Sequence, residues 1–198
     1  MTETLDIAAL VGSRICHDLI SPIGAIGNGV ELISIDGTTA GPEMMLISES
    51  VAHANARIRF FRIAFGASST DQRIGKVEVA AVLSDISHGS RVQIDWDSPN
   101  DLARRDVKLL FLLVLCLEAA MPFGGKVTIS RSETRWHLAA TSPKLRVDPA
   151  LWDRVQNPKA VVDIGPAQVQ FALVPDEISR QHRRLSLEIG AAEIVISF

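Results

Sequence analysis

Residues 4–35 read TLDIAALVGSRICHDLISPIGAIGNGVELISI, and this stretch decides the architecture of the N-terminal part of the chain. Its apolar side chains recur at spacings of three and four residues, which is the period of one face of an α-helix. At 100° per residue, His17 lies roughly 180° from the middle of this apolar stripe. We therefore predict a long amphipathic helix that exposes His17. The stripe comprises Ala8, Val11, Ile15, Leu19, Pro22, Ile26, Val30 and Ile33.

A second helix is expected after a turn at residues 36–39, because Gly41-Pro42 favours a helix start. From Met44 to Phe65 apolar residues recur at alternating spacings of three and four, the seam of a helical bundle. A two-helix hairpin cannot bury both stripes alone. We expect a homodimer in which two hairpins form a four-helix bundle with His17 facing outwards. The alternative is that the hairpin packs on the C-terminal domain of its own chain.

Composition excludes several classes of function. A net charge of −3 without a long basic run argues against a nucleic acid partner. Cys16 and Cys116 stand apart from any Cys-x-x-Cys pair, which argues against a disulfide framework or a zinc site. The apolar residues 109–117 are too few to span a membrane, and the N-terminus lacks a signal-peptide layout. We expect a soluble, cytoplasmic protein that binds no membrane.

Beyond residue 67 the pattern changes. Residues 67–75 are small and polar, as in a linker, and divide the chain into domains at 1–67 and 75–198. The second domain is predicted to be an α/β sandwich with helices layered on one sheet, so the whole chain is of the α+β class. Its expected strands are residues 91–97, 126–130, 136–141, 185–189 and 193–197. Its expected helices are residues 105–121, a short one capped by Asp148 with Pro149 in its first turn, and one from Gly165-Pro166 to about residue 182.

This order of hairpin and sandwich resembles the dimerisation and ATP-binding domains of sensor histidine kinases, and His17-Asp18 followed by Pro22 resembles their phosphoacceptor box. The nucleotide site departs from that pattern. Val114 and Glu118 occupy the positions of the two asparagines that hold magnesium in kinases. Residues 163–167, DIGPA, lack the glycines of the adenine motif, and no glycine-rich lid follows. The resemblance therefore implies a degenerate, ATPase-like sandwich with no cofactor.

Over its whole length the chain resembles the ChpT-type histidine phosphotransferases, an alphaproteobacterial phosphorelay family. The resemblance rests mainly on residues 14–22, RICHDLISP, and residues 57–67, RIRFFRIAFGA. It implies a homodimer that accepts phosphate from the receiver domain of a hybrid histidine kinase and passes it to downstream response regulators. The family works without ATP, and the receiver supplies the magnesium. We therefore expect a phosphotransfer intermediate without autokinase activity.

His17 and Asp18 are the candidate catalytic residues. An exposed imidazole is mostly neutral at cytoplasmic pH and can attack phosphorus with one ring nitrogen. Asp18 resembles the acidic residue that orients the histidine and accepts its proton, although a role in helix solubility explains it as well.

The candidate receiver-binding residues lie around His17. Counting from the turn, Arg59 to Arg62 are expected opposite His17, where Arg57, Arg59, Arg62 and Arg14 would attract an acidic receiver. They could equally solvate the bundle or pair with carboxylates. The full set that we expect to contact a receiver is Arg14, Ile20, Ser21, Gly24, Gly27, Asn28, Arg59 and Arg62.

Two other functions fit the sequence. An unusual ATP-dependent histidine kinase would label itself from ATP. A non-catalytic dimeric adaptor would bind receivers, and its His17→Ala variant would relay as much phosphate as the wild type.

Overall fold

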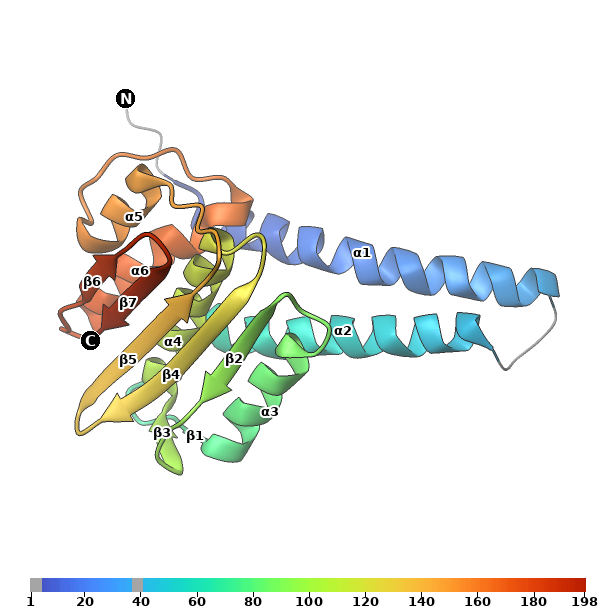
Figure 1. The fold of residues 1–198 in the computed structure, drawn as a ribbon, viewed down its shortest axis with the longest axis horizontal. Coiled ribbons are helices and arrows are strands. Elements are labelled where there is room, and N and C mark those ends of the chain that lie inside the picture. Colours follow the sequence, from blue (N-terminus) through green and yellow to red (C-terminus); the bar gives the residue numbers. More distant parts are fainter. Residues whose placement is uncertain (1–4, 37–40) are drawn as a thin grey trace.

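A computed structural model describes residues 5–36 and 41–198. Its N-terminal part is an antiparallel pair of helices, α1 (Ile7–Asp36) and α2 (Pro42–Ala64), which project away from the rest of the molecule (Figure 1). Pro42 lies in the first turn of α2, as the Gly41-Pro42 pair predicts. The predicted hairpin is therefore confirmed. The predicted turn at residues 36–39 and the predicted helix start at Thr4 lie largely outside the described residues.

The two helices of the hairpin approach each other closely at Gly29. A Cβ atom added to this glycine would lie 2.6 Å from Cγ1 of Ile47 and 3.3 Å from the carbonyl oxygen of Glu43. The absence of a side chain at Gly29 therefore lets the helices approach, and it fixes which residues of α2 lie level with each residue of α1.

The C-terminal part contains a five-stranded mixed sheet in the order β2-β4-β5-β7-β6. Only the β2–β4 pair is parallel, and the other three pairs are antiparallel. Buried and exposed residues alternate along the central strands, because one face of the sheet is covered by helices and the other is not. All five strands were predicted, with ends within two residues. They are β2 (Val92–Trp96), β4 (Gly125–Ser132), β5 (Arg135–Thr141), β6 (Ser186–Ile189) and β7 (Glu193–Ser197).

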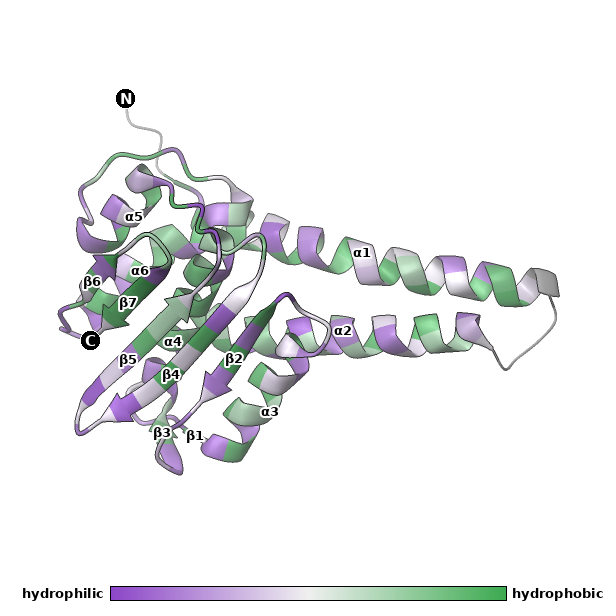
Figure 2. Ribbon diagram, viewed as in Figure 1, coloured by the Kyte–Doolittle hydropathy of each residue, from purple (hydrophilic) through white to green (hydrophobic). Residues whose placement is uncertain are grey.

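Helix α4 (Arg104–Ala120) lies at the centre of the molecule, between the sheet and its neighbouring helices (Figures 1 and 2). Every residue from 109 to 117 is buried, so this apolar run covers all sides of the helix. Helices α5 (Pro149–Gln156) and α6 (Val169–Arg180) complete the layer, and the short 3-10 helix η1 (Pro166–Gln168) leads into α6. Asp148 caps α5 as predicted, since its Oδ1 accepts hydrogen bonds from the backbone N–H groups of Ala150 and Leu151.

Three elements were not predicted. Helix α3 (Lys76–Ser87) packs beside α2 and β2, and strands β1 (Arg73–Gly75) and β3 (Asp101–Ala103) form a separate two-stranded sheet. Strand β1 occupies the end of the segment that the sequence assigned to a linker.

The base of the hairpin belongs to the same hydrophobic core as the sheet. Phe60 of α2 is fully buried and stacks on Phe111 of α4, with ring centroids 4.6 Å apart. Phe61, Ile63 and Ala64 are buried beside it. The alternative that the hairpin packs on its own C-terminal domain thus holds at its base, whereas its distal part extends free (Figure 1). The division into domains at 1–67 and 75–198 stays a prediction.

Among the described residues, no helix combines the length and the hydropathy that a bilayer crossing requires.

Candidate functional site

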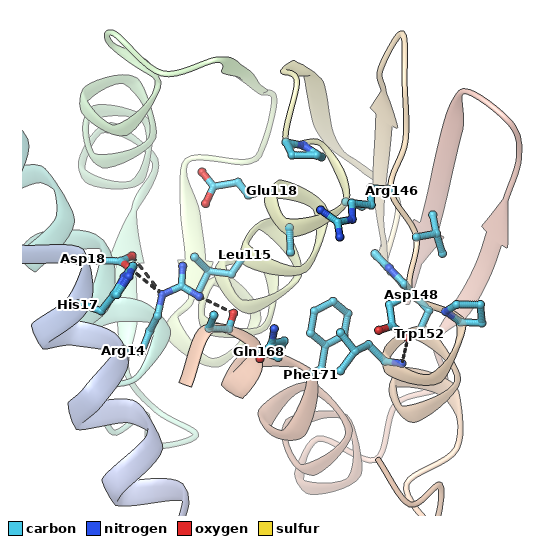
Figure 3. A pocket seen from close by; sticks show the side chains of 17 residues that line it. Arg14, His17, Asp18, Leu115, Glu118, Arg146, Asp148, Trp152, Gln168 and Phe171 are labelled. Carbon is cyan, nitrogen blue, oxygen red and sulfur yellow. Dashed lines mark hydrogen bonds and ion pairs between the residues drawn. The ribbon is translucent and has the colours of Figure 1, made fainter. Parts of the chain in front are cut away.

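His17 lies on α1, close to the point where the hairpin meets the C-terminal domain (Figure 3). Its side chain is 82 % exposed, as its position opposite the apolar stripe predicts. A nucleophile must be reached by its partner, so this exposure is the first requirement for transfer chemistry at the imidazole.

Asp18 contacts the imidazole directly. Its Oδ1 lies 3.2 Å from Nδ1 of His17, and its side chain is only 13 % exposed. An ionised carboxylate is purely an acceptor, so this contact favours a proton on Nδ1 and leaves the lone pair of the neutral ring on Nε2. The pair therefore combines an accessible imidazole with a carboxylate that can orient it, as a nucleophile for phosphate transfer would require.

Arg14 holds Asp18 from the other side. Its Nε lies 3.1 Å from both carboxylate oxygens, one helical turn away, and its Nη1 donates to the carbonyl oxygen of Ala167 at 2.7 Å. The Arg14 side chain is only 13 % exposed. Nε and Nη1 are thus directed at partners within the chain, and the contact of Arg14 with a receiver stays a prediction.

A cavity of about 820 Å³ opens between α1 and the C-terminal domain, and we call it the His17 cleft. Leu115 and Glu118 of α4 form one wall, and Trp152 of α5 with Phe171 of α6 forms an aromatic wall (Figure 3). The remaining lining residues are Arg14, His17, Asp18, Ala119, Ala120, Pro122, Arg146, Val147, Asp148, Pro149, Leu151, Ala167 and Gln168.

Val114 and Glu118, which the sequence resemblance aligned with the magnesium-holding asparagines of histidine kinases, have different surroundings. The Val114 side chain is fully buried in the core. Glu118 lines the His17 cleft and forms an ion pair with Arg57 of α2, with Oε2 and Nη1 3.6 Å apart. The Glu118 carboxylate therefore already has a cationic partner.

The predicted docking residues on α1 form one open face of the distal hairpin. Ile20 is 69 % exposed, and Ser21 and Asn28 are exposed as well. A Cβ atom added to Gly24 or Gly27 would meet nothing within 4 Å. This face is thus accessible next to His17, and its contact with a receiver stays a prediction.

The arginines of α2 differ in their relation to the His17 cleft, because Arg57 pairs with Glu118, which lines it. Gly29 lies between Glu43 and Ile47, so counting twelve residues along each helix puts His17 level with residues 55–59, a range that includes Arg57 and Arg59 but not Arg62. Arg59 pairs instead with Asp85 of α3 at 2.5 Å, and neither Arg59 nor Arg62 lines the His17 cleft. The stagger of the two helices thus shifts the predicted level by about one turn and leaves Arg62 outside it.

Sequence reasoning missed the partners of Arg14 in the C-terminal domain. Gln170 is fully buried, and its Oε1 accepts from Nη1 of Arg14 at 3.4 Å. The only signal was a polar residue inside the apolar run Val169 to Val174, since a buried amide must find partners. The Ala167 contact is made by a backbone carbonyl, which leaves no trace in the sequence.

Comparison with known proteins agrees with this geometry. Residues 77–193 match the family model described as "Histidine phosphotransferase C-terminal domain". The chain is 32 % identical to "Protein phosphotransferase ChpT" of Brucella abortus (strain 2308), over 98 % of this chain and 96 % of that protein. It also superposes on a solved structure titled "1.7 Angstrom Structure of a Bacterial Phosphotransferase", with a TM-score of 0.83 and 31 % identity over 100 % of this chain and 97 % of the other. The chain belongs to the histidine phosphotransferase family.

Proposed function

We propose that this phosphorelay protein takes a phosphoryl group from the aspartate of a receiver domain onto His17 and passes it to the receivers of response regulators, without ATP. The donor receiver would belong to a hybrid histidine kinase, and the exchange would take place in the cytoplasm. The observation that carries the proposal is an imidazole that is 82 % exposed while its neighbouring carboxylate is held in place.

The transfer needs only His17 and the receiver with its bound magnesium. Nε2 of His17 attacks the phosphorus of the aspartyl phosphate, the N–P bond forms, and the P–O bond to the aspartate breaks to release its carboxylate. The proton on Nδ1 stays hydrogen-bonded to Asp18, which offsets the positive charge on the phosphorylated ring. In the second transfer an acceptor aspartate attacks, the N–P bond breaks, and its electron pair returns to Nε2. His17 is thus a carrier, and the chain is a phosphotransfer intermediate.

Magnesium would come with the receiver. Phosphoryl transfer depends on alignment and on neutralising charge on the equatorial oxygens, and a cation held by the receiver meets the second need. The buried Val114 and the paired Glu118 support this assignment, because neither offers a free ligand at the kinase magnesium position.

The receiver would dock on the open face of α1. Small residues at Ser21, Gly24 and Gly27 allow close approach of a partner backbone, and Ile20 offers apolar area next to His17. Asn28 extends this face towards the tip of the hairpin. Arg59 and Arg62 lie outside the His17 cleft, so they would attract an acidic receiver only at longer range.

We further propose that two chains pair through their hairpins in a four-helix bundle. Met44, Val51 and Ile58 recur every seven residues along α2, and each is at least 40 % exposed in the single chain. Ile58 also lines an apolar groove of about 330 Å³ at the base of the hairpin, together with Val11 and Ile15 of α1. Ile15 lies on the other side of α1 from His17, so pairing of hairpins at this groove leaves the imidazole free.

The decisive test is incubation with a receiver phosphorylated on its aspartate with radiolabelled phosphate. The wild type should acquire acid-labile label that mass spectrometry maps to His17, and His17→Ala should acquire none. His53→Ala, which removes another exposed histidine of the hairpin, should be labelled like the wild type.

Each alternative function predicts a different result. Labelling from ATP without a receiver would indicate a kinase. Undiminished relay by His17→Ala would indicate an adaptor or another acceptor, and would contradict the proposal.

A further inference from the structure

Arg14 joins the phosphoacceptor region to the C-terminal domain. Its Nε lies 3.1 Å from each carboxylate oxygen of Asp18, and its Nη1 donates to the carbonyl of Ala167 at 2.7 Å and to Oε1 of Gln170 at 3.4 Å. Ala167 and Gln170 are more than 150 positions away in sequence. One guanidinium therefore connects the residue next to His17 with η1 and α6.

The anchor on the C-terminal side is rigid. Gln170 is fully buried, and its Nε2 donates to the carbonyl oxygens of Ala167 at 3.1 Å and Leu115 at 3.5 Å. These two bonds fix which end of the amide faces Arg14, so Oε1 can only point towards the guanidinium. Arg14 thus lies against two acceptors whose positions are set by the core.

We propose that Arg14 is a positioning residue through which the C-terminal domain sets the tautomer of His17. The inference rests on the proposed function, since it concerns the reactivity of His17 as phosphoacceptor. Arg14 holds Asp18 inwards at 13 % exposure, and Asp18 in turn holds the proton of the imidazole on Nδ1. Nε2, on another edge of the ring, then presents its lone pair to the incoming phosphorus.

The same contacts give the C-terminal domain a role at the site that requires no nucleotide. Without Arg14, Asp18 would be a single carboxylate on a helix surface, free to change rotamer and to leave the imidazole. Both tautomers would then be populated, and Nε2 would be protonated, and so unreactive, in part of the molecules. Arg14 and Gln170 act on transfer through Asp18, without touching the reacting atoms.

The first measurement is the tautomer itself. Nitrogen NMR of full-length protein labelled with ¹⁵N-histidine, at about pH 8 where an ordinary imidazole is neutral, distinguishes a protonated ring nitrogen from an unprotonated one. The His17 signals are assigned by their loss in His17→Gln. In the wild type we expect the proton on Nδ1, and in Arg14→Ala we expect both tautomers. A wild-type His17 with its proton mainly on Nε2 would overturn the proposal without any variant.

The second measurement is single-turnover transfer from a phosphorylated receiver. The rate should fall with the fraction of rings protonated on Nδ1, and a misplaced Asp18 adds to the loss. Arg14→Ala should therefore transfer more slowly, by up to about a hundredfold, with little change in the receiver concentration at half-saturation. Arg14→Lys keeps a positive charge near Asp18 but loses the planar fork, and it should restore the rate in part. Gln170→Leu should behave like a milder Arg14→Ala.

Arg104→Ala is the matched control. Arg104 also bridges the two parts of the chain through carbonyl acceptors, at 3.0 Å to Arg62 and 3.5 Å to Ala67, but it does not touch Asp18. It should keep the wild-type tautomer and rate.

Two results would contradict the inference. One is a wild-type tautomer and rate in Arg14→Ala, and the other is an equal loss in Arg104→Ala, which would point to general loosening of the structure. If phosphate instead maps to a residue other than His17 in the wild type, the proposed function fails, while the tautomer measurement still reports whether Arg14 acts on the imidazole.

Discussion

At the scale of residues, two neighbouring polar side chains of α1 differ strongly in burial. His17 and its neighbour Asp18 are adjacent on one helix, yet the imidazole is 82 % exposed and the carboxylate 13 %. The difference arises because Asp18 is held by Arg14 against the C-terminal domain, whereas His17 has only the carboxylate as a polar partner among the described residues. An accessible imidazole and the carboxylate that contacts it are therefore placed in different environments within one helical turn.

The two cysteines give a prediction at this scale. Cys116 is fully buried in α4, and burial raises the pKa of its thiol well above the usual range, because a thiolate would lose its hydration. Cys16 is exposed on α1. Alkylation of the native protein at about pH 8 should modify Cys16 and spare Cys116 until the protein is unfolded. Intact-protein and peptide mass spectrometry measure both, and equal modification of the two would show that the core of α4 is open to solvent.

At the scale of elements, the contact between α1 and α2 depends on Gly29. A methyl group there would lie 2.6 Å from Cγ1 of Ile47, closer than packed atoms tolerate. Gly29→Ala should lower the free energy of unfolding by about 1–3 kcal/mol, the usual cost of overpacking.

Gly12→Ala is the matched control for Gly29, because a Cβ atom at Gly12 meets nothing within 4 Å on the same helix. It should raise the free energy of unfolding by up to about 1 kcal/mol through helix propensity. Urea denaturation compares the two variants. Equal effects would mean that the helices are not in contact at Gly29.

Elements with a strong local pattern could be predicted, and those that depend on distant partners could not. Helix α4 is indicated in the sequence by its apolar run, and the strands of the main sheet by alternating apolar and polar residues. Strands β1 and β3 have three residues each and exist only because Arg73 to Gly75 pair with Asp101 to Ala103. In the site, the helical periodicity of α1 predicts the exposure of His17. The contact of Arg14 with the carbonyl of Ala167 depends on the tertiary fold and could not be predicted.

At the scale of the whole molecule, the hairpin carries apolar side chains that one chain leaves exposed. Ile58 is 43 % exposed and lines the groove at the base of the hairpin. A carboxylate there would lose its hydration on burial in a bundle, a cost that Arg62, which lines the same groove, offsets only in part. Ile58→Asp should convert a wild-type dimer into a monomer. Sedimentation analysis measures the mass, and a monomeric wild type would contradict the bundle.

Val77→Asp serves as the control for Ile58. Val77 is 83 % exposed on α3, away from the hairpin groove. This variant should sediment like the wild type, and a change would show that added charge alone alters the assembly.

The stack of Phe60 on Phe111 also affects how the newly made chain folds. The two rings are about fifty positions apart, and ribosomes add about 5–20 residues per second. The aromatic end of the hairpin therefore leaves the ribosome several seconds before α4 can cover it. During that interval the apolar surface around Phe60 is exposed to solvent, and we expect general chaperones to bind the nascent chain at this surface.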